Sequence, residues 1–522
     1  MLRVPSGNFQ IIGDQRFDWC LRTEPEPNMA NRRLQWPRGK VLGGSSAING
    51  LVAIRGHRDD YDGWNAMGCV GWGWNDVLPH FLRLEDFEPG ASELHNVGGP
   101  LPLSIARGRH FLCEKYADAG AEVLGLSRND DFNGRSQEGS GYHHVNVSRG
   151  LIPVRVSAAT AYLKEARRRA NLKIVTGATA LRIDFDGRRA KGIVYAQGQT
   201  TYSATARRQV ILCAGTVFSP HLLQLSGIGA PDHLRSLGIK VVEARSGVGE
   251  NLQDHLQTLS VYRVNVPTVN DKVRHILSKL ATAFEGMIMR TGPYYGVTNF
   301  GMFVRTERNL TRPDTQFHIH PASGSFKTPD RFSGLTVSAY KLRPESRGRI
   351  VPLSADARVM PAIYANYLSA PSDQQVAVAT LRISRKLSES RAIEPFIDEE
   401  RKPGSQLQTD DELLDYARQT GETTYHPVGT CRMGGDDASV VDPRLRVRGL
   451  AGLYVADASI MPTLISGNTH LPSVMIGEKA AEIVRDDERR RPIIAIRSDS
   501  APSPASVTAD VQSRRDAEAL RD

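Results

Sequence analysis

The sequence contains few cysteines, no long apolar segment and no block of basic residues. Its five cysteines lie far apart, and none forms the C-x-x-C or C-x-x-C-H motifs of structural zinc sites, thioredoxin-like chemistry or covalent c-type haem. Cysteine usage of this kind favours a reducing, cytoplasmic compartment. No run of eighteen apolar residues occurs, so we expect no membrane-spanning helix. Residues 1–14 also lack the apolar core of a signal peptide.

The charge excess is small and spread along the chain. Lys and Arg number 66 against 57 Asp and Glu, a net charge of +9 over 522 residues, without a clustered basic stripe or a nucleic-acid-binding motif. We therefore expect no nucleic-acid partner, while association with an acidic membrane surface or protein stays open. A content of 40% hydrophobic and 24% charged residues is ordinary for a globular chain, and the length is enough for two or three domains.

Residues 172–229 contain the pattern of an α/β fold. Four short runs rich in β-branched residues, LKIVT, ALRIDF, AKGIVYA and QVILCAG, are separated by Asp-Gly and Gly-Gln turns and predict strands. The last run leads through a glycine turn into TVFSPHLLQLSGIG, which predicts a helix. A buried strand, a tight turn and a helix in this order indicate an α/β fold. Another helix is expected at residues 152–168, with Ser157 near its start.

Residues 257–424 have a different pattern, which predicts a second domain. An amphipathic helix is expected at 272–289, because apolar residues recur on one face. The strand-like runs are 314–321, 335–342 and 348–353. His318 and His320 alternate on the first of these strands and therefore share a face. A half-buried strand explains this pair better than a metal site, since no third ligand accompanies it.

Two histidines carry the most informative chemistry. His426 lies in the segment TTYHPVGTCRMGG, and His470 lies in the loop SGNTH, after a predicted strand that ends at Asp457. A helix with Pro472 in its first turn follows this loop. Alcohol oxidation needs one group that accepts the hydroxyl proton and another that holds the developing alkoxide. Imidazole suits the first task because its pKa lies near neutrality. Two structural histidines remain the alternative, and we expect Cys431 to be a buried packing residue.

Five segments resemble the signatures of the glucose–methanol–choline (GMC) oxidoreductase family of FAD-dependent alcohol oxidases and dehydrogenases. The segments are WPRGKVLGGSSAINGLVAIRG (36–56), AGTVFSPHLLQLSGIG (214–229), GVGENLQDH (247–255), TTYHPVGTCRMGG (423–435) and residues 441–484. They occur in the order of the family, and the resemblance runs from about residue 15 to residue 485. The chain looks closest to the choline-dehydrogenase-like and aliphatic-alcohol-dehydrogenase branch.

The resemblance implies roles for individual residues. His426 would be the catalytic base, and His470 matches the position of the second active-site group, which is His or Asn in the family. The residues matched to FAD contacts are Arg38, Leu42, Gly43, Gly44, Ser45, Asn49, Gly50, Leu51, Val52, Ala180, Asp457 and Ala458. Two adjacent glycines let backbone amides approach a cofactor closely. Ile48 stands where some members attach the flavin through His, so the FAD is expected to be bound non-covalently.

The resemblance also implies the architecture. The cofactor domain would have an α/β fold, and the class of the whole chain would be α+β. A Rossmann-like FAD-binding domain would comprise residues 1–256 and 425–485, and residues 257–424 would form a substrate-binding domain of an antiparallel sheet plus helices. Residues 486–522 are charged and aperiodic and predict a disordered tail. Family members begin with a βαβ unit that bears G-x-G-x-x-G. This sequence contains no such motif, so we expect an N-terminally truncated cofactor domain. Either the start of the sequence is incomplete, or the chain as written holds FAD poorly.

The implied activity is oxidation of a primary alcohol, either choline-like or aliphatic or aromatic, to the aldehyde. The proton would pass to His426 and the hydride to the flavin, and a quinone, a cytochrome or O2 would reoxidise the flavin. A homodimer is the expected assembly. Two alternatives stay open: a cofactor-poor remnant that acts as a binding protein, and a hydroxynitrile-lyase-type member whose flavin is structural. The sequence identifies neither the alcohol nor the electron acceptor.

Overall fold

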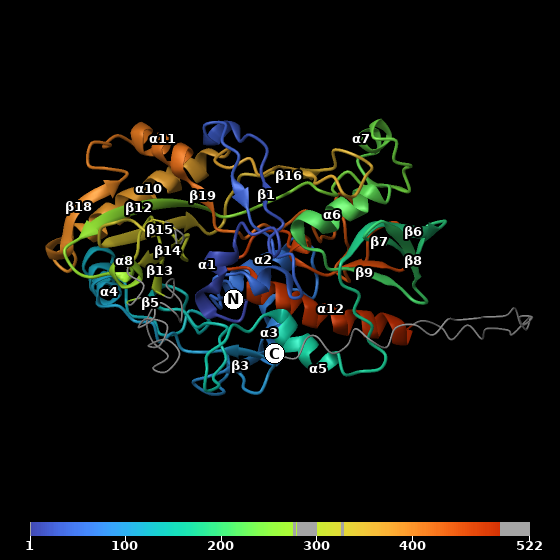
Figure 1. Ribbon diagram of the computed structural model, residues 1–522, viewed down its shortest axis with the longest axis horizontal. Coiled ribbons are helices and arrows are strands. Elements are labelled where there is room, and N and C mark those ends of the chain that lie inside the picture. Colours follow the sequence, from blue (N-terminus) through green and yellow to red (C-terminus); the bar gives the residue numbers. More distant parts are fainter. Residues whose placement is uncertain (1, 275–277, 279–299, 325–327, 491–522) are drawn as a thin grey trace, which may run out of the picture. The chain divides into compact units, whose positions relative to one another are not determined.

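The computed structural model describes residues 2–274, 278, 300–324 and 328–490 (Figure 1). The chain divides into two compact units, Met1–Ala481 and Glu482–Asp522. All strands of the described residues belong to the first unit. Within the described residues, no helix is both long enough and apolar enough to cross a bilayer.

A seven-stranded antiparallel sheet is the largest sheet of the described residues (Figure 1). Its strand order is β18-β12-β15-β14-β13-β5, and β19 also pairs with β12. In this order the strands span Ile397–Lys402, Leu256–Val264, Gly334–Lys341, Thr315–His320, Phe300–Val304 and Gly139–Tyr142, and β19 spans Glu422–Thr423. The predicted strands at 314–321 and 335–342 are confirmed. Strand β5 comes from outside residues 257–424, so the predicted domain border does not enclose the whole sheet.

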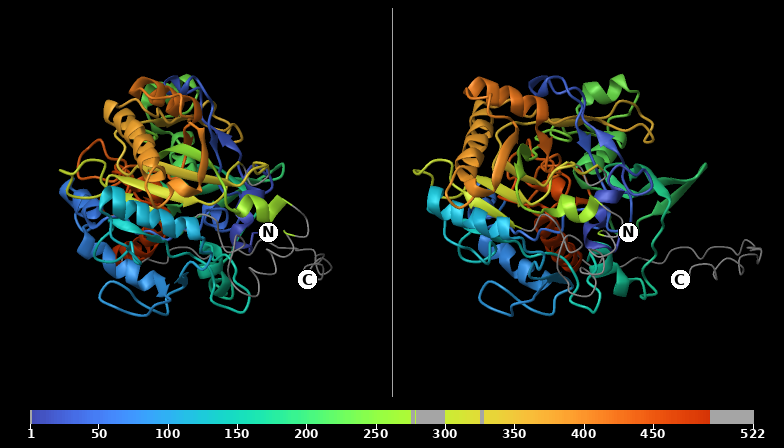
Figure 2. Two further views of the ribbon diagram at one scale, coloured as in Figure 1. Left: turned by 90° about the vertical axis from the view of Figure 1, so that its left-hand side faces the viewer. Right: turned by 60° about the vertical axis from the view of Figure 1, so that its left-hand side comes forward.

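The two faces of this sheet differ in chemistry. Phe317 of β14 belongs to an apolar cluster with residues of α4 (Phe111–Leu124) and α10 (Pro371–Ser388), the cyan and orange helices of Figure 2. Because side chains alternate along a strand, the residues on either side of Phe317 lie on the opposite face. His318 and His320 therefore share that face, as predicted, and their rings stack with centroids 5.9 Å apart.

The predicted α/β element is present. Strands β9 (Val210–Leu212) and β20 (Leu453–Val455) form a parallel pair, and α6 (Gly215–Leu225) follows β9 after a short turn. Gly215 has a φ of +82°, a backbone conformation that favours glycine. The order of strand, glycine turn and helix is thus confirmed, whereas the truncation of this domain stays a prediction.

A second, three-stranded antiparallel sheet contains β6 (Ala178–Asp186), β7 (Arg189–Gln197) and β8 (Thr200–Thr205). The strand predicted for LKIVT at 172–176 is wrong, because that segment forms neither helix nor strand. The sequence pattern also does not reveal β8. All six of its residues are exposed, so no alternation of apolar residues marks it, and its pairing with β7 makes it a strand.

One predicted helix is shorter than expected, and another lies mostly outside the described residues. The helix at 152–168 begins only at Ala159, as a π-helical turn, and ends with α5 (Lys164–Ala166). Ser157 lies just before it and bonds Thr160 through its hydroxyl at 2.9 Å. Of the helix predicted at 272–289, α8 (Val269–Arg274) includes the first residues, and nearly all of the remainder lies outside the described residues.

Helix α12 (His470–Arg490) is longer than expected. It begins at His470 itself, so this histidine belongs to the helix and not to the loop before it. Pro472 lies in the first turn, as predicted. The helix continues past residue 485, which corrects the predicted start of the tail, and residues 491–522 lie outside the described residues.

The remaining elements are short or lie at the periphery of these sheets. They are η1 (Pro5–Gly7), α1 (Asn8–Ile11), β1 (Leu21–Arg22), η2 (Pro27–Met29), β2 (Gln35–Trp36), η3 (Gly44–Ala47), α2 (Arg58–Ala66), α3 (Trp74–Leu84), β3 (Glu85–Phe87), β4 (Leu101–Leu103), β10 (Ile228–Gly229), α7 (Pro231–Ser236), β11 (Glu243–Ala244), β16 (Arg349–Val351), β17 (Ala362–Tyr364), η6 (Glu394–Phe396), α11 (Asp410–Thr420) and η7 (Ala458–Ile460). Strand β16 confirms the strand predicted at 348–353.

Candidate active site

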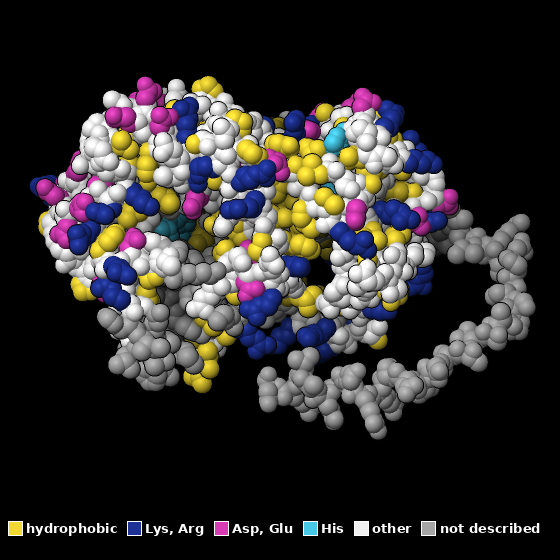
Figure 3. Space-filling model, turned by 45° about the horizontal axis from the view of Figure 1, so that its top comes forward, with side chains coloured by type: hydrophobic (Ala, Val, Ile, Leu, Met, Phe, Trp, Pro, Cys, Tyr) yellow, Lys and Arg dark blue, Asp and Glu magenta, His cyan; other side chains and the backbone are white. Residues whose placement is uncertain are grey.

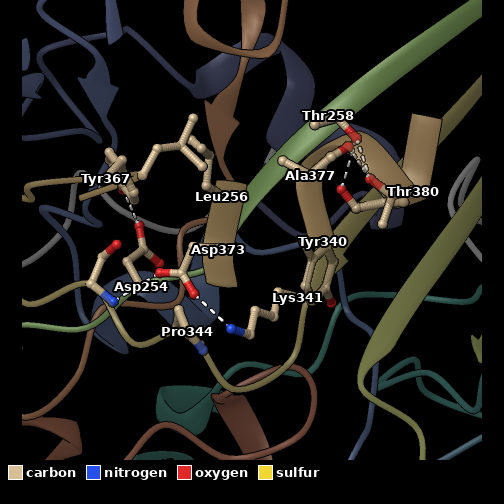
Figure 4. Close-up of a pocket in the computed structure, with 13 residues that line it drawn as sticks. Asp254, Leu256, Thr258, Tyr340, Lys341, Pro344, Tyr367, Asp373, Ala377 and Thr380 are labelled. Carbon is tan, nitrogen blue, oxygen red and sulfur yellow. Dashed lines mark hydrogen bonds and ion pairs between the residues drawn. The ribbon is translucent and has the colours of Figure 1, made fainter. Parts of the chain in front are cut away.

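His426 is held by a buried carboxylate beside the large sheet. Its backbone N–H donates to Asp254 Oδ1 at 2.8 Å, and Asp254 Oδ2 accepts from the hydroxyls of Tyr367 and Thr423 at 2.5 Å each. Burial raises the pKa of Asp254, and these donors offset part of that effect. Figure 4 shows Asp254 and Tyr367 bonded to each other in a pocket that Tyr340 also lines. Asp254 therefore holds the backbone of the segment that carries His426 in place.

The hydrogen bonds of His255 fix the tautomer of His426. His255 Nε2 lies 2.8 Å from the carbonyl oxygen of Leu342, which can only accept, so Nε2 carries a proton. Burial lowers the pKa of His255 to about 3, which leaves the ring neutral and Nδ1 an acceptor. His426 Nδ1 lies 3.0 Å from His255 Nδ1 and must therefore be the donor. Thr424 Oγ1 accepts from the same nitrogen at 2.9 Å, and the lone pair of His426 is left on Nε2.

Asn468 lies beside this lone pair. Its Nδ2 donates to His426 Nε2 at 3.1 Å. Burial, together with nearby His255 and Arg38, lowers the pKa of His426 well below its ordinary value. The imidazole is thus neutral at neutral pH, with a lone pair of defined direction. Such a group can act as a general base.

Two residues with left-handed backbone flank the site. Leu51 has a φ of +69° and Tyr425 a φ of +68°. A left-handed non-glycine residue costs on the order of 1–3 kcal/mol and persists where the surroundings fix it. The N–H of Leu51 donates to Asn49 Oδ1 at 3.2 Å, and that of Tyr425 donates to Thr423 Oγ1 at 2.7 Å. Strain of this kind next to both the base and the predicted cofactor segment is typical of functional sites.

The predicted cofactor loop folds back on itself. A Cβ on Gly39 would lie 2.2 Å from the carbonyl oxygen of Gly44, so only glycine fits there. Gly43 has a φ of +89°, which also favours glycine. The N–H of Gly39 donates to Ser45 Oγ at 3.2 Å and closes the loop. Leu42 is 52% exposed although it is apolar.

Arg38 joins this loop to the segment of His426. Its Nη2 donates to the carbonyl oxygen of Tyr425 at 2.9 Å, and its backbone N–H donates to Asp18 Oδ1 at 2.9 Å. Burial lowers the pKa of the guanidinium. Its Nε is buried and has no hydrogen-bond partner within the described part of the chain. The structure thus joins the first signature segment to the segment that carries His426.

Arg155 anchors Asn49, one of the predicted cofactor residues. Its Nη1 donates to the backbone oxygen and to Oδ1 of Asn49 at 2.7 and 2.8 Å, and its Nη2 donates to the carbonyl of Pro5 at 2.7 Å. The residue is 2% exposed, and burial lowers its pKa to about 10. Beyond Asn49, Gly50 is exposed and Val52 is buried. No sequence pattern had singled out Arg155.

The structure does not pair the two predicted catalytic histidines. In the part of the chain that the structure describes, no hydrogen bond links His470 to His426, and Asn468 makes that contact instead. His470 Nε2 is buried and has no hydrogen-bond partner among those residues. Burial and the charge of Arg155 lower the pKa of His470 to about 4. The catalytic role of His470 stays a prediction.

Asp457 and Ala458 lie at the end of β20, next to the start of α6. Asp457 Oδ2 accepts from the Gly215 N–H at 2.9 Å and from Ser219 Oγ at 2.5 Å, so this carboxylate holds the N-terminus of α6. Ala458 accepts a hydrogen bond from the Gly429 N–H at 3.4 Å. The remaining predicted contact, Ala180, lies half-buried on β6, opposite Tyr195 of β7.

These residues fit a bound FAD. The loop of Gly43 and Gly44 can approach a cofactor closely, and the exposed Leu42 offers it an apolar surface. The buried, unpartnered nitrogens of Arg38 and His470 are donors or acceptors in need of a partner. Among the described residues, no group of three or more His, Cys, Asp or Glu could hold a metal ion. Cys431 is buried and free, as expected of a packing residue.

Two protein-family models, both of GMC oxidoreductases, match the sequence of this chain. One matches residues 23–257 and the other matches residues 344–477. The chain belongs to the GMC oxidoreductase family. It is therefore an FAD-dependent oxidoreductase that acts on CH–OH donors.

Curated relatives support this assignment of the GMC oxidoreductase. The chain is 38% identical over 489 residues to the oxygen-dependent choline dehydrogenase of Brucella ovis, an alignment that covers 92% of this chain and 88% of the relative. It is 40% identical over 490 residues to the oxygen-dependent choline dehydrogenase of Paraburkholderia phymatum, with coverage of 92% and 85%.

Solved structures show the same mixed α/β fold. Pyridoxine 4-oxidase from Mesorbium loti matches with a TM-score of 0.84 and 29% identity, over 94% of this chain and 92% of that one. Formate oxidase from Aspergillus oryzae matches with a TM-score of 0.85 and 25% identity, over 94% and 91% of the two chains.

Three residues at the centre of the site had no predicted role. His255 and Asp254 end the segment GVGENLQDH, which carries the family resemblance but gives no sign that its last residues contact His426. Asn468 lies in SGNTH, two residues before the histidine that the sequence favours. The loop has no periodic sequence pattern, so only the fold shows that the Asn468 side chain contacts His426.

Proposed function

We propose that this GMC oxidoreductase oxidises a primary alcohol, choline-like or aliphatic or aromatic, to the aldehyde. The observation that carries the proposal is the chain of hydrogen bonds from Leu342 through His255 to His426, which leaves the lone pair of His426 on Nε2. In this state His426 Nε2 accepts the hydroxyl proton of the alcohol. The similarity to oxygen-dependent choline dehydrogenases and to pyridoxine 4-oxidase supports a CH–OH substrate.

Asn468 and Asp254 support the proton transfer from two sides. The Asn468 amide N–H beside Nε2 donates to the substrate oxygen as negative charge grows on it. When Nε2 takes the proton, the ring becomes cationic, and the Asp254 carboxylate at its backbone N–H favours that charge. His470 is proposed as the second catalytic group, which also steadies the developing alkoxide.

The glycine loop and the segment that follows it are proposed to hold FAD. They comprise Arg38, the residues from Leu42 to Ser45 and those from Asn49 to Val52, with Ala180, Asp457 and Ala458 as further contacts. Bound FAD supplies the acceptor for the hydride of the carbinol carbon. Ile48 is 4% exposed and packs with Ile11 and Ala47, so it offers no nucleophile, which supports non-covalent binding.

The electron acceptor is proposed to be O2, a quinone or a cytochrome. The relatives named as oxygen-dependent choline dehydrogenases support O2 as one of these acceptors. The homodimer and the cytoplasmic location also stay predictions.

The test is a visible absorption spectrum of the purified chain with FAD, recorded before and after anaerobic addition of a primary alcohol. We expect a flavin spectrum that bleaches, with the aldehyde as the product. A flavin that no alcohol bleaches, in a protein that cleaves a cyanohydrin, would replace the proposal with a lyase. A folded protein that binds no FAD would replace it with a cofactor-free binding protein.

A further inference from the structure

The large sheet buries a polar face toward the active site. Its apolar face packs against α4 and α10, and alternation places Gln316, His318 and His320 of β14 on the other face, with Tyr340 of β15. Of these residues, Gln316, His318 and Tyr340 are buried, although a buried sheet face is ordinarily apolar. The burial of these polar side chains next to the active site therefore needs an explanation.

Hydrogen bonds connect this face to the base. Tyr340 donates its hydroxyl proton to Gln316 Oε1 at 2.6 Å, and Gln316 Nε2 lies 3.5 Å from Asn468 Oδ1. Asn468 in turn bonds His426. The ring of Tyr340 lies 6.0 Å from that of His426 and 5.8 Å from that of His318. The polar face therefore begins at the reacting nitrogen and extends away from it along the strands.

Three ring nitrogens on this face have no hydrogen-bond partner among the described residues. They are Nδ1 of His318 and both ring nitrogens of His143, the residue that follows β5. The two rings lie 5.4 Å apart, and His143 is fully buried. His143 packs over Gly301, where a Cβ would lie 2.5 Å from its Nε2. Unpaired buried nitrogens are costly, so a cluster of them beside a base indicates a partner that binds from outside the chain.

Among the described residues, no carboxylate bonds the unpartnered ring nitrogens of His143 and His318. Burial lowers the pKa of His143 to about 3 and that of His318 well below its ordinary value, so both rings are neutral. Asp254, the carboxylate beside the base, already accepts four hydrogen bonds, from the hydroxyls of Tyr367 and Thr423 and from the backbone N–H groups of His255 and His426. A cationic substrate would lose its hydration here without gaining a charged partner.

We propose that this polar face selects an uncharged alcohol with a second hydrogen-bonding group, such as a hydroxyl, about one ring away from its CH–OH group. His318 and His143 are the specificity-determining residues, and Tyr340 positions Gln316 and His318. The inference rests on the proposed function, because it assigns a substrate class to the same site. It separates this protein from its relatives named as choline dehydrogenases, whose substrate is a quaternary ammonium cation.

The test uses the FAD-loaded protein and matched neutral alcohols. Anaerobic flavin reduction is measured with 3-hydroxybenzyl alcohol, benzyl alcohol and choline. We expect the second-order rate constant of flavin reduction to be at least about tenfold higher for 3-hydroxybenzyl alcohol than for benzyl alcohol, because its extra hydroxyl forms a hydrogen bond with a buried group. Choline should have the lowest rate constant. Equal values for the two benzyl alcohols, or the highest value for choline, would overturn the inference.

Variants assign the preference to particular side chains. His318→Phe should reduce the ratio between the two benzyl alcohols to nearly one. Tyr340→Phe removes only one hydroxyl and should lower the same ratio partly, even if His318→Phe fails to fold. His221→Gln is the matched control, because His221 is also buried with an unpartnered Nε2 but lies on α6. A ratio that survives in both test variants would contradict the assignment.

A binding measurement separates this inference from the proposed function. Binding of 3-methylphenol and toluene, neither of which carries a CH–OH group, is followed by the change in the flavin spectrum. Tighter binding of 3-methylphenol, lost in the His318→Phe variant, supports the polar face whether or not an alcohol is oxidised. If no alcohol bleaches the flavin, the proposed function fails. If alcohols bleach it but 3-methylphenol and toluene bind equally, only the present inference fails.

Discussion

The Nδ1 atoms of His255 and His426 lie 3.0 Å apart, in two rings that are nearly perpendicular at 89°. Since the second nitrogen of His255 donates to a backbone carbonyl, His255 can only accept from His426. A neutral histidine thus fills the place where many enzymes use a carboxylate to orient a base. The lone pair of His426 is therefore on Nε2, on the far side of its ring, where the proposed proton transfer would take place.

Replacement of the base should stop flavin reduction without loss of the cofactor. His426→Asn keeps a polar side chain of smaller size, but it has no lone pair suited to accept the hydroxyl proton. We expect the rate of flavin reduction by alcohol to fall by about 10²–10⁴-fold, the usual contribution of a general base. Stopped-flow absorbance at a saturating alcohol concentration measures this rate. Full reduction at the wild-type rate would rule out His426 as the base.

Loss of the orienting histidine should change the pH profile as well as the rate. His255→Phe removes the acceptor for His426 Nδ1, and we expect kcat to fall by about 10-fold or more because the ring is no longer held in one tautomer. It also removes the influence by which His255 lowers the pKa of His426. The pKa of His426 then rises, so the acid limb of kcat/KM moves to higher pH.

A conservative variant distinguishes this positioning role from a general defect in folding. His255→Gln still offers an acceptor oxygen and should recover part of the rate and of the original pH profile. If His255→Gln and His255→Phe show the same rate and the same pH profile as the wild-type protein, His255 does not orient the base.

Removal of the Asp254 charge should destabilise the protein. In Asp254→Asn an amide nitrogen replaces one of the oxygens that accept from Tyr367, Thr423 and the His426 N–H. We expect the free energy of unfolding to fall by about 1–3 kcal/mol, the cost of unpaired buried donors, as measured by urea denaturation. The exposed Asp437→Asn is the control and should change it by less than about 0.5 kcal/mol.

The FAD affinity should depend on Arg155, although this residue lies outside the predicted contacts. Arg155→Met keeps the length of the side chain but removes the two guanidinium hydrogen bonds to the backbone and side-chain oxygens of Asn49. We expect FAD to bind about tenfold more weakly or worse, since two lost hydrogen bonds amount to roughly 1–3 kcal/mol. Flavin fluorescence measures the affinity. Arg308→Met, at an exposed arginine, should leave it unchanged.

The contribution of His95 to stability should decrease as the pH rises above neutrality. This buried side chain lies 2.9 Å from Asp131 and 3.2 Å from Glu85, and these partners raise its pKa although burial acts in the opposite direction. The stabilising effect of a raised pKa is fully present below about pH 6.5 and is lost as the pH rises through the folded-state value. The difference in Tm between wild type and His95→Gln should therefore shrink from pH 6 to pH 9. A difference that grows with pH would contradict this assignment.

Local patterns predict the parts of the fold that depend on neighbouring residues. Alternation places His318 and His320 on one face of β14, because successive side chains of any strand point to opposite sides. The strand, glycine turn and helix around Gly215 are also visible in the sequence. LKIVT at 172–176 fails as a strand because β-branched residues need a paired neighbour strand to supply backbone hydrogen bonds. Residues 200–205 form a strand for the opposite reason, since β7 supplies those bonds.

The sequence by itself determined the family, the glycine loop and His426, because long motifs record which residue types a cofactor and a base require. Only the tertiary structure decided which groups surround His426. His255 is 171 residues away in the chain, and Arg155 is 106 residues away from Asn49. Hydrogen bonds between such distant segments leave no periodic trace in a sequence, since each depends on the packing of separate elements. The same packing, and no motif, brought Asn468 into hydrogen-bond contact with His426 Nε2.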